Sequence, residues 1–511
     1  MPWWKSRGAR GGLLFLLAFA IAWMRWHTYA EPRERDLDIY AWIGHYLLQG
    51  RHLYTDLVDI KPPLPYLLYA LAELAAGFGA AQAYLLGVVS AWATLFGLYW
   101  LGARALAQPW VGAAAAVCWV LLGSDLYLQA NQPNTEVFIN AFFVWAVALL
   151  WSLPRDRLAL AQCIGIGLLF GCASLCKTVA VVPAALLLLA QFAFADAATA
   201  RGRVLRQIAI TTAIIAIMWL LVFAWLGITG SAAAAWQILF VYPADYARLA
   251  GPGVVGNILI AFAGDHFMPS FFVVQAWLVL VCAAAALIQL QGEDRPLALR
   301  MLVWMAGIFL AVALPGQAFA HYFQLWLPWL CVAVALSIAW TAAAVARARI
   351  VVANVLLIVF AAAWGGLWLW PQYKLSAAEW SLAKYERQFV DTEALGHELG
   401  ARLKPRQRLF VFGVLPGLYR AAGREPPSGV LNLWLALPGY GAGLSPALGR
   451  RVLDELQRQP PDMIVLDGWT WQLAGAGNPI REWIKSHYEI VGDRYDYSLA
   501  IPMAAKPAVK P

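Results

Sequence analysis

Long apolar runs alternate with short polar connections over the first 370 or so residues of the chain. A helix needs about 20 mostly apolar residues to cross a bilayer, and most of the runs approach that length. The pattern therefore predicts an α-helical polytopic membrane protein with about eleven spans. The expected spans are residues 11–28, 82–102, 109–126, 137–153, 158–176, 178–195, 207–228, 271–290, 301–315, 322–342 and 350–370.

A further apolar run, residues 62–79, is ambiguous because it opens KPPLP, contains Glu73 and is barely long enough to cross. If it lies in the interface and the N-terminus is cytoplasmic, every cytoplasmic loop is basic, as the positive-inside rule requires. A crossing helix would turn the same arginines outward. We therefore predict an interfacial helix at 62–79. The arginines concerned are Arg104, Arg155, Arg157, Arg201, Arg203, Arg206, Arg295, Arg300, Arg347 and Arg349.

This topology places four segments on the outer face of the membrane: residues 29–80, 126–136, 229–270 and everything after Pro371. The loop 229–270 joins WQILFVYPADYARL to the glycine-rich AGPGVVG, which predicts short interfacial helices and a flexible connection. Such a loop can act as a lid over a site or simply tether two helices, and both interpretations stay open.

After Tyr373 the composition becomes that of an ordinary soluble domain. Residues 376–403 are amphipathic and predict helix, and residues 479–488 predict another. Two short apolar runs at 409–413 and 463–468 are bounded by glycine and charge, which is typical of buried strands. The chain thus divides into a transmembrane domain, 1–371, and a small α/β domain, 372–511.

Composition supports a membrane protein, with 62% hydrophobic and only 13% charged residues and a mean hydropathy of +0.63. Soluble proteins carry about 25% charged residues. The net charge of +8 fits basic cytoplasmic loops, so we expect no nucleic-acid partner. The six cysteines fall in apolar runs and suggest neither disulfides nor a metal cluster. Lys5, Arg7 and Arg10 precede the first apolar run without a cleavage site, which predicts a retained first helix.

Acidic residues gather where the first helix leaves the membrane, in the segment 31–69. Asp36 and Asp38 lie two residues apart, and Asp59 follows in the same segment. A solvated loop would explain them equally well in isolation. Glu136 lies at the outer end of another helix, however, and two carboxylates from separate outer loops can converge in one cavity, as glycosyl chemistry requires.

Two lysines lie at the same outer boundary. Lys61 precedes two prolines that fix its backbone, and Lys177 falls where one helix ends and the next begins. Facing several acids, the pair suits an anionic lipid headgroup such as a phosphate, although each lysine could simply snorkel to the interface. His321 and Tyr322, in FAHYFQLWLP, are either polar ligand contacts or members of the aromatic belt.

Together these motifs resemble a known family. The run D-x-x-x-Y from Asp36 to Tyr40, then LLQG, LYTDLVD and KPPL, is similar to the first outer loop of bacterial glycosyltransferase family 39 and its relatives. These are dolichyl-phosphate-mannose protein mannosyltransferase-like enzymes of the GT-C fold, which include the lipid A aminoarabinose transferase. Further matches are the TE before Val137, GCASLCKT and HYFQLWLP, so the resemblance covers roughly residues 10–345.

The resemblance implies a GT-C glycosyltransferase with Asp36 in the place of the catalytic aspartate. Glu136 stands where the family has a second acidic residue, often aspartate followed by proline, whereas here valine follows. Lys61 and Lys177 match basic positions that contact the lipid phosphate, and Tyr40 matches the tyrosine of the first motif. Asp38 is an additional acid without an assigned role.

The sequence therefore predicts an inverting enzyme that moves a hexosyl or pentosyl group from a polyprenyl-phosphate donor to an acceptor hydroxyl at the periplasmic face. The acceptor, a glycan, lipid or protein, and the sugar remain open. No cofactor is assigned. The acids could supply oxygen ligands for a divalent metal ion, but without a specific spacing. A transporter or flippase, which would need charges in mid-span, is the alternative, and a scaffolding subunit is a third reading.

Overall fold

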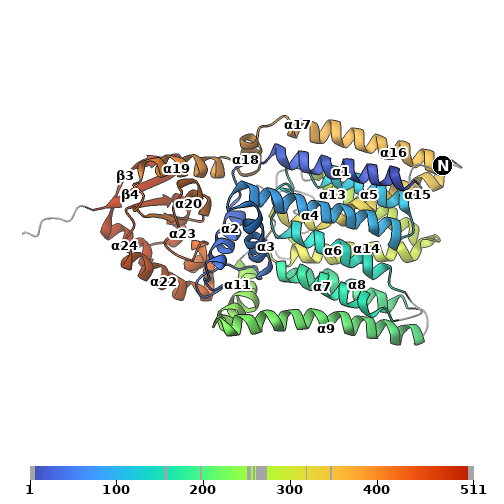
Figure 1. The fold of residues 1–511 in the computed structure, drawn as a ribbon, viewed down its shortest axis with the longest axis horizontal. Helices are drawn as coiled ribbons and strands as arrows, with labels where there is room; N and C mark the ends of the chain where they lie inside the picture. The colour runs from blue at the N-terminus through green and yellow to red at the C-terminus, as the bar shows by residue number, and fades with distance from the viewer. Residues whose placement is uncertain are drawn as a thin grey trace, which may run out of the picture.

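The computed structural model describes residues 6–154, 158–195, 198–249, 255–256, 259, 273–317, 319–345 and 348–503. A bundle of long helices fills one end of an elongated molecule, and a small sheet with its own helices fills the other (Figure 1). The short helices α2 (Arg35–Leu48) and α3 (Leu64–Ala76) lie between the two parts. The segment following Gln372 therefore packs at one end of the bundle and not along its side.

The bundle contains a helix at each of the eleven predicted apolar segments. Six helical segments in the described part are long and apolar enough to cross a membrane, and five others that match expected spans are shorter. The chain is a multi-pass membrane protein, as predicted. The helices are α1 (Arg7–His27), α4 (Ala80–Trp100), α5 (Pro109–Leu122), α6 (Thr135–Trp151), α7 (Leu160–Cys176), α8 (Val181–Ala193), α9 (Ala198–Ile228), α13 (Val273–Ile288), α14 (Arg295–Ala313), α15 (Leu327–Val345) and α16 (Arg349–Ala363).

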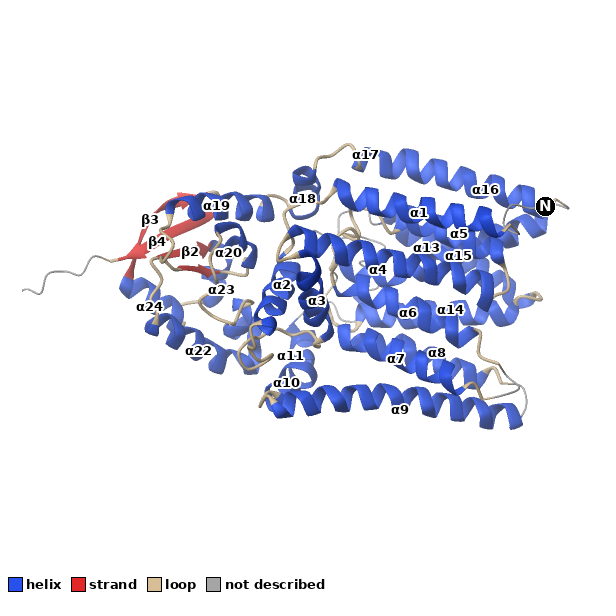
Figure 2. Cartoon of the chain, viewed as in Figure 1, coloured by secondary structure: helices blue, strands red, loops and turns tan. Residues whose placement is uncertain are grey.

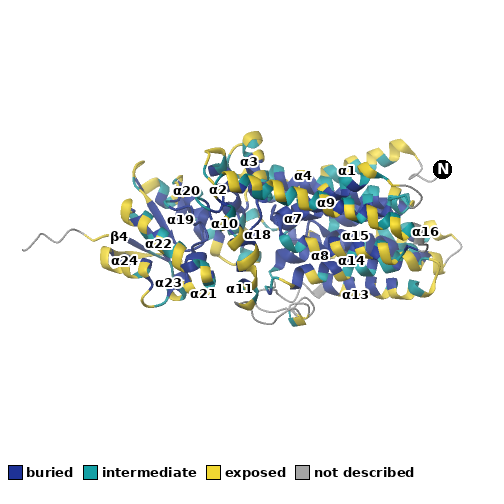
Figure 3. Cartoon of the chain, turned by 90° about the horizontal axis from the view of Figure 1, so that it is seen from below, coloured by how far each residue is buried: buried dark blue, intermediate teal, exposed yellow. Residues whose placement is uncertain are grey.

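Exposed apolar side chains mark the outside of the bundle. On α1, Phe15 and Trp23 are 69% and 66% exposed, and Leu220 on α9 is 68% exposed. Helices α5, α6 and α15 are mostly buried, and Figure 3 shows dark blue around α15 in the middle of the bundle. Apolar residues on a soluble surface would be costly. A ring of apolar helices around a packed centre is instead the arrangement expected in lipid.

The ambiguous run 62–79 forms one short helix, α3 (Leu64–Ala76), of 13 residues. At 1.5 Å per residue it is about 20 Å long, less than the roughly 30 Å hydrocarbon core. It packs against α2 (Arg35–Leu48). Gly44 makes this close approach feasible, because a Cβ there would lie 2.8 Å from the backbone nitrogen of Ala70. The interfacial placement of this run stays a prediction.

The loop predicted at 229–270 begins with short helical pieces, as expected. They are α10 (Ala232–Trp236), a π-helical turn (Gln237–Val241) and α11 (Tyr242–Leu249). Most of the glycine-rich connection lies outside the described residues, as do Arg155, Arg157 and Arg347 of the basic loops.

The last part of the chain is the predicted α/β unit (Figure 2, strands in red). Its four-stranded sheet has the order β1-β2-β4-β3, with β1 and β2 parallel and the other pairs antiparallel. The runs LFVF and MIVLD form β1 and β2, as expected, and residues 376–403 form two helices separated near Glu386. The elements are α18 (Ala377–Tyr385), α19 (Gln388–Arg402), β1 (Leu409–Phe412), α20 (Pro416–Ala422), α21 (Pro438–Gly441), α22 (Ser445–Arg458), β2 (Met463–Asp467), α23 (Gly468–Ala474), α24 (Pro479–His487), β3 (Tyr488–Arg494) and β4 (Tyr497–Pro502).

Helix α20 docks this unit onto α2. The Trp42 indole donates to the Pro416 carbonyl at 3.2 Å. At Gly417 a Cβ would lie 2.5 Å from a carboxylate oxygen of Asp38, so any larger residue would force the Asp38 side chain to shift. A parallel bridge between Val58 and Val430 adds a second point of attachment. The residues after α2 are thereby held against both the bundle and the sheet unit.

Candidate active site

Asp36 lies in the first turn of α2, with Glu34 as the N-cap residue. The Glu34 carboxylate accepts a hydrogen bond from the Asp36 backbone nitrogen at 3.0 Å. Acidic residues are favoured here because the first amides of a helix have no partner within it. Tyr40 follows one turn later, so its hydroxyl reaches Asp36 Oδ2 at 3.3 Å and Asn134 Oδ1 at 3.2 Å. The D-x-x-x-Y spacing thus places both groups on one face.

Lys61 projects from the loop before α3, with its Nζ 3.9 Å from Asp36 Oδ2. The Tyr54 hydroxyl donates to the Lys61 carbonyl at 2.8 Å, which fixes the backbone together with the two following prolines. Asp59 accepts a hydrogen bond from Tyr66 at 2.8 Å. Lys61 therefore contacts Asp36, and the charges of both Asp36 and Asp59 favour its charged form.

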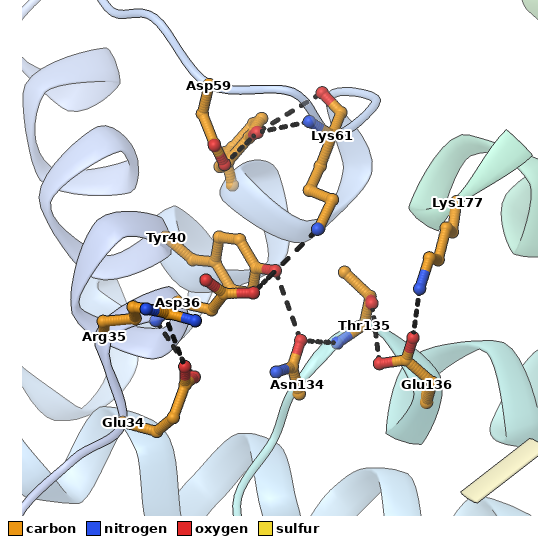
Figure 4. Close-up of polar contacts among 11 residues, drawn as sticks. Glu34, Arg35, Asp36, Tyr40, Asp59, Lys61, Asn134, Thr135, Glu136 and Lys177 are labelled. Carbon is orange, nitrogen blue, oxygen red and sulfur yellow. Dashed lines mark hydrogen bonds and ion pairs between the residues drawn. The ribbon is translucent and has the colours of Figure 1, made fainter. Parts of the chain in front are cut away.

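Glu136 and Lys177 form a second ion pair, with 2.7 Å between Nζ and Oε1. Glu136 opens α6 and is completely buried, and the Thr135 hydroxyl donates to its other oxygen at 2.9 Å. Lys177 lies just beyond the last residue of α7, with its ammonium 3.2 Å from the centre of the Tyr322 ring. Figure 4 shows both ion pairs and the hydrogen bonds through Asn134 that link them.

A narrow cavity of about 30 Å³ lies above this network. Five separate parts of the chain line it, namely the start of α2, the loop before α3, helix α11, the segment before α15, and the sheet unit. Among the described residues, Asp36, Asp59, Lys61, His321 and Tyr322 line it, whereas Glu136 and Lys177 lie outside the lining. The full lining is Glu34, Arg35, Asp36, Asp59, Ile60, Lys61, Tyr246, Phe319, His321, Tyr322, Val414, Asn432, Trp434 and Tyr440.

The carboxyl groups of the cavity differ in their proton affinity. Burial alone would raise the pKa of Asp36, but the charges of Lys61 and Arg35 outweigh it and hold that pKa below its ordinary value. Burial, reinforced by the charge of Asp36, raises the pKa of Glu34 to about 8. Burial also raises the pKa of Asp59 to about 6. At neutral pH Asp36 is therefore ionised while Glu34 largely keeps its proton, which separates a base from a neutral acid.

No protein-family model and no curated protein matches the sequence. The structure is similar to that of ArnT from Cupriavidus metallidurans bound to undecaprenyl phosphate, with a TM-score of 0.61 and 15% identity over 96% of this chain and 98% of that one. The apo form of the same protein gives a TM-score of 0.64 at 14% identity. The chain has the GT-C fold.

A second GT-C structure is similar over most of its length. It is the archaeal oligosaccharyltransferase AglB from Archaeoglobus fulgidus, in complex with an inhibitory peptide and a dolichol-phosphate. Its TM-score is 0.54 at 14% identity, covering 98% of this chain and 75% of AglB. The GT-C fold that the sequence motifs implied is therefore confirmed from the structure.

In this GT-C chain Asp38 is placed apart from the cavity. Residues two positions apart in an α-helix are separated by about 200° of rotation, so the side chains of Asp36 and Asp38 face in different directions. Asp38 is fully buried and pairs with Arg33 at 2.6 Å and with Arg420 at 3.0 Å. Its place is at the interface between α2 and α20.

The sequence analysis missed several lining residues. Glu34 carried a usable signal, because an acidic residue directly before a helix is a common N-cap. Asn134, which lies outside the lining and accepts a hydrogen bond from Tyr40, carried another, since it precedes α6 in the same way. Asn432, Trp434 and Tyr440 carried none, since nothing in a sequence shows that a loop of the sheet unit returns to α2.

Within the described residues, no three His, Cys, Asp or Glu side chains gather closely enough to hold a metal ion. The charges of Asp36 and Asp59 both favour the charged form of Lys61.

Proposed function

We propose that this protein is an inverting glycosyltransferase that takes a sugar from a polyprenyl-phosphate donor. The observation that carries the proposal is the ionised Asp36 with the Lys61 ammonium 3.9 Å away, on the wall of a buried cavity. ArnT is known in a complex with undecaprenyl phosphate and AglB in one with dolichol-phosphate, and both have this fold. A base and a phosphate-binding cation side by side are what such a transfer needs.

In the proposed reaction Asp36 removes the proton from an acceptor hydroxyl as its oxygen attacks the anomeric carbon. The bond from that carbon to the phosphate oxygen breaks, and the electron pair leaves with the polyprenyl phosphate. Lys61 stabilises the charge that grows on this phosphate, an effect that is strong where water is excluded. Asp36 afterwards returns its proton to water. Attack from the face opposite the leaving group inverts the anomeric centre.

Lys177 would add a second positive charge on the phosphate side. Glu136 neutralises it at 2.7 Å, and the Tyr322 ring holds its ammonium. We therefore propose that Glu136 positions Lys177, with Asp36 as the base. Tyr40 would orient Asp36 through its hydroxyl.

We further propose that the cavity faces the periplasm of a bacterial inner membrane, with the N-terminus cytoplasmic and residues 372–511 forming the periplasmic domain. The support is the distribution of arginines along the loops. A transporter would be expected to carry its charged groups near the middle of its spans. Here Asp36 lies in the first turn of α2 and Lys61 in the loop before α3, both outside the long helices of the bundle, so an enzyme is the better proposal.

The test is consumption of donor by the full chain in lipid nanodiscs. Undecaprenyl phosphates carrying different sugars are supplied, and release of undecaprenyl phosphate is measured. Asp36→Asn should lower turnover about 10²- to 10⁴-fold, the usual contribution of a general base. Asp56→Asn is the matched control, because Asp56 is half-exposed in the same outer segment and lies outside the described lining of the cavity. Full turnover by Asp36→Asn would show that Asp36 is not the general base.

A further inference from the structure

One wall of the cavity comes from residues 431–440 of the sheet unit, which the proposed chemistry does not use. Leucines at alternate positions, Leu431, Leu433 and Leu435, are buried at 6%, 2% and 0% exposure. They point into the core of the sheet unit. The intervening Asn432 and Trp434 both line the cavity opposite Asp36.

The side-chain amide oxygen of Asn432 has no hydrogen-bond donor among the described residues. The Asn432 side chain is 8% exposed, and its Oδ1 is buried and accepts no hydrogen bond from any residue in the described part of the chain. Buried polar atoms are rarely left in this state. An orphaned amide oxygen on a cavity wall therefore calls for a ligand that donates a hydrogen bond, as a hydroxyl does.

Beside this amide the wall is aromatic. The Trp434 indole nitrogen already donates to the Thr470 hydroxyl at 3.0 Å, so the ring contributes apolar surface only. The Tyr440 ring lies 5.4 Å from the Trp434 ring and 5.8 Å from that of Tyr246. Apolar rings with one or two polar groups suit a molecule with C–H faces and hydroxyl edges, such as a sugar ring.

The charged side chains of the cavity balance one another, and the donor phosphate at Lys61 is the one ligand charge that the proposed reaction needs. Arg35 and Lys61 are positive, and Asp36 and Asp59 are negative at neutral pH. Glu34, with its pKa raised to about 8 by burial and by Asp36, is mostly uncharged. A carboxylate on the sugar would face two acids, and an amino group would face Arg35, whose guanidinium lies 4.8 Å from the centre of the Trp434 ring. An uncharged ring is therefore favoured.

We infer that Asn432 binds a hydroxyl group of an uncharged sugar ring that reacts at Asp36, with Trp434 and Tyr440 as its apolar wall. This inference rests on the proposed function and adds a substrate class to it. The ring belongs either to the donor or to the acceptor, and the chemistry is the same. Because a cavity of about 30 Å³ is too small for a sugar ring, the contact between the Tyr246 and Tyr440 rings has to open for the ring to enter.

The test measures binding to the full chain in nanodiscs, using undecaprenyl phosphate alone and undecaprenyl phosphate carrying glucose, mannose or glucuronate. Methyl glucoside and methyl mannoside, added with undecaprenyl phosphate present, probe the acceptor position. The wild type should bind at least one uncharged sugar probe more tightly than its sugar-free counterpart, and should not prefer glucuronate. Asn432→Leu should weaken that preference by about tenfold, the value of one buried hydrogen bond, and leave the affinity for undecaprenyl phosphate unchanged.

Asn432→Asp keeps an acceptor oxygen at the same place and should retain most of the preference, which a merely structural role would not predict. Gln457→Leu, a change of an exposed amide on α22, is the control. If Asn432→Leu weakens the preference for the lipid-linked sugars, the ring belongs to the donor. If it weakens the binding of the methyl glycosides, the ring belongs to the acceptor. A preference that Asn432→Leu leaves intact, or no preference for any uncharged sugar, overturns the inference. If the wild type fails to bind undecaprenyl phosphate at all, the proposed function itself falls.

Discussion

The Asp38 carboxylate accepts a hydrogen bond from the Arg420 guanidinium at 3.0 Å, although 382 residues separate the two along the chain. Arg33 approaches the same oxygen at 2.6 Å. Asp38 is fully buried, so both arginines compensate a charge that would otherwise be costly. The pair fastens α20 to α2 and so holds the sheet unit over the cavity.

Removing Arg420 should therefore destabilise the protein without disabling its chemistry. Arg420→Met is expected to lower the free energy of unfolding by about 3 kcal/mol, the lower end for a broken buried pair, because Arg33 still compensates Asp38. The melting temperature of the full chain in detergent measures the loss. Arg402→Met is the control, since it breaks an ion pair with Glu398 on a half-exposed surface and should cost less than about 1 kcal/mol. Equal shifts for the two variants would contradict a docking role.

The two lysines should differ in their effect on lipid binding. Lys61 has only a loose contact with Asp36, whereas Lys177 is already neutralised by Glu136 at 2.7 Å. Lys61→Met should therefore weaken binding of undecaprenyl phosphate about tenfold or more, and Lys177→Met should weaken it less. Titration of each variant in nanodiscs with undecaprenyl phosphate measures the difference. A larger effect at Lys177 would show that the phosphate site is misplaced.

Lys177→Met should instead reduce stability, because it leaves Glu136 buried without a partner. A loss of about 3 kcal/mol is expected for such a charge. The double variant Lys177→Met/Glu136→Gln should recover much of it, since no buried charge remains. Thermal melting of the two variants is the measurement, and a double variant no more stable than the single one would mean that the ion pair is not the cause.

Stability should depend on pH through Glu34. Its pKa is raised from 4.5 to about 8 in the folded protein, so the folded state holds a proton that the unfolded chain releases. Stability therefore falls as pH rises through this range, with the loss complete above about pH 8. Asp59 acts in the same direction only up to about pH 6. The lowered pKa of Asp36 affects stability only at pH values below that range.

Between pH 6.5 and 8.5 the wild type should lose melting temperature more steeply than Glu34→Gln, which cannot ionise yet still accepts the hydrogen bond from the Asp36 backbone nitrogen. Melting curves of both proteins at several pH values provide the comparison. Parallel slopes for the wild type and the variant would show that Glu34 does not titrate in this window.

The sequence by itself determined the membrane architecture. Each predicted span coincides with a helix, and the run 62–79 is short and lies beside α2, because hydrophobic length and periodicity act locally. It also supplied Asp36, Tyr40 and Lys61, which lie within 26 residues of one another in sequence, on α2 and the loop before α3. Helical spacing alone puts Asp36 beside Tyr40.

Only the tertiary structure decided how the acids divide their roles. The sequence does not distinguish Asp36 from Asp38. Because α2 rotates between the two positions, Asp36 lines the cavity and Asp38 pairs with Arg420. Glu136 appeared to be a second carboxylate of the cavity, and the fold instead buries it against Lys177. The wall formed by Asn432, Trp434 and Tyr440 depends on the docking of α20 against α2. Such contacts join residues almost 400 positions apart, and no local pattern of polar and apolar residues records them.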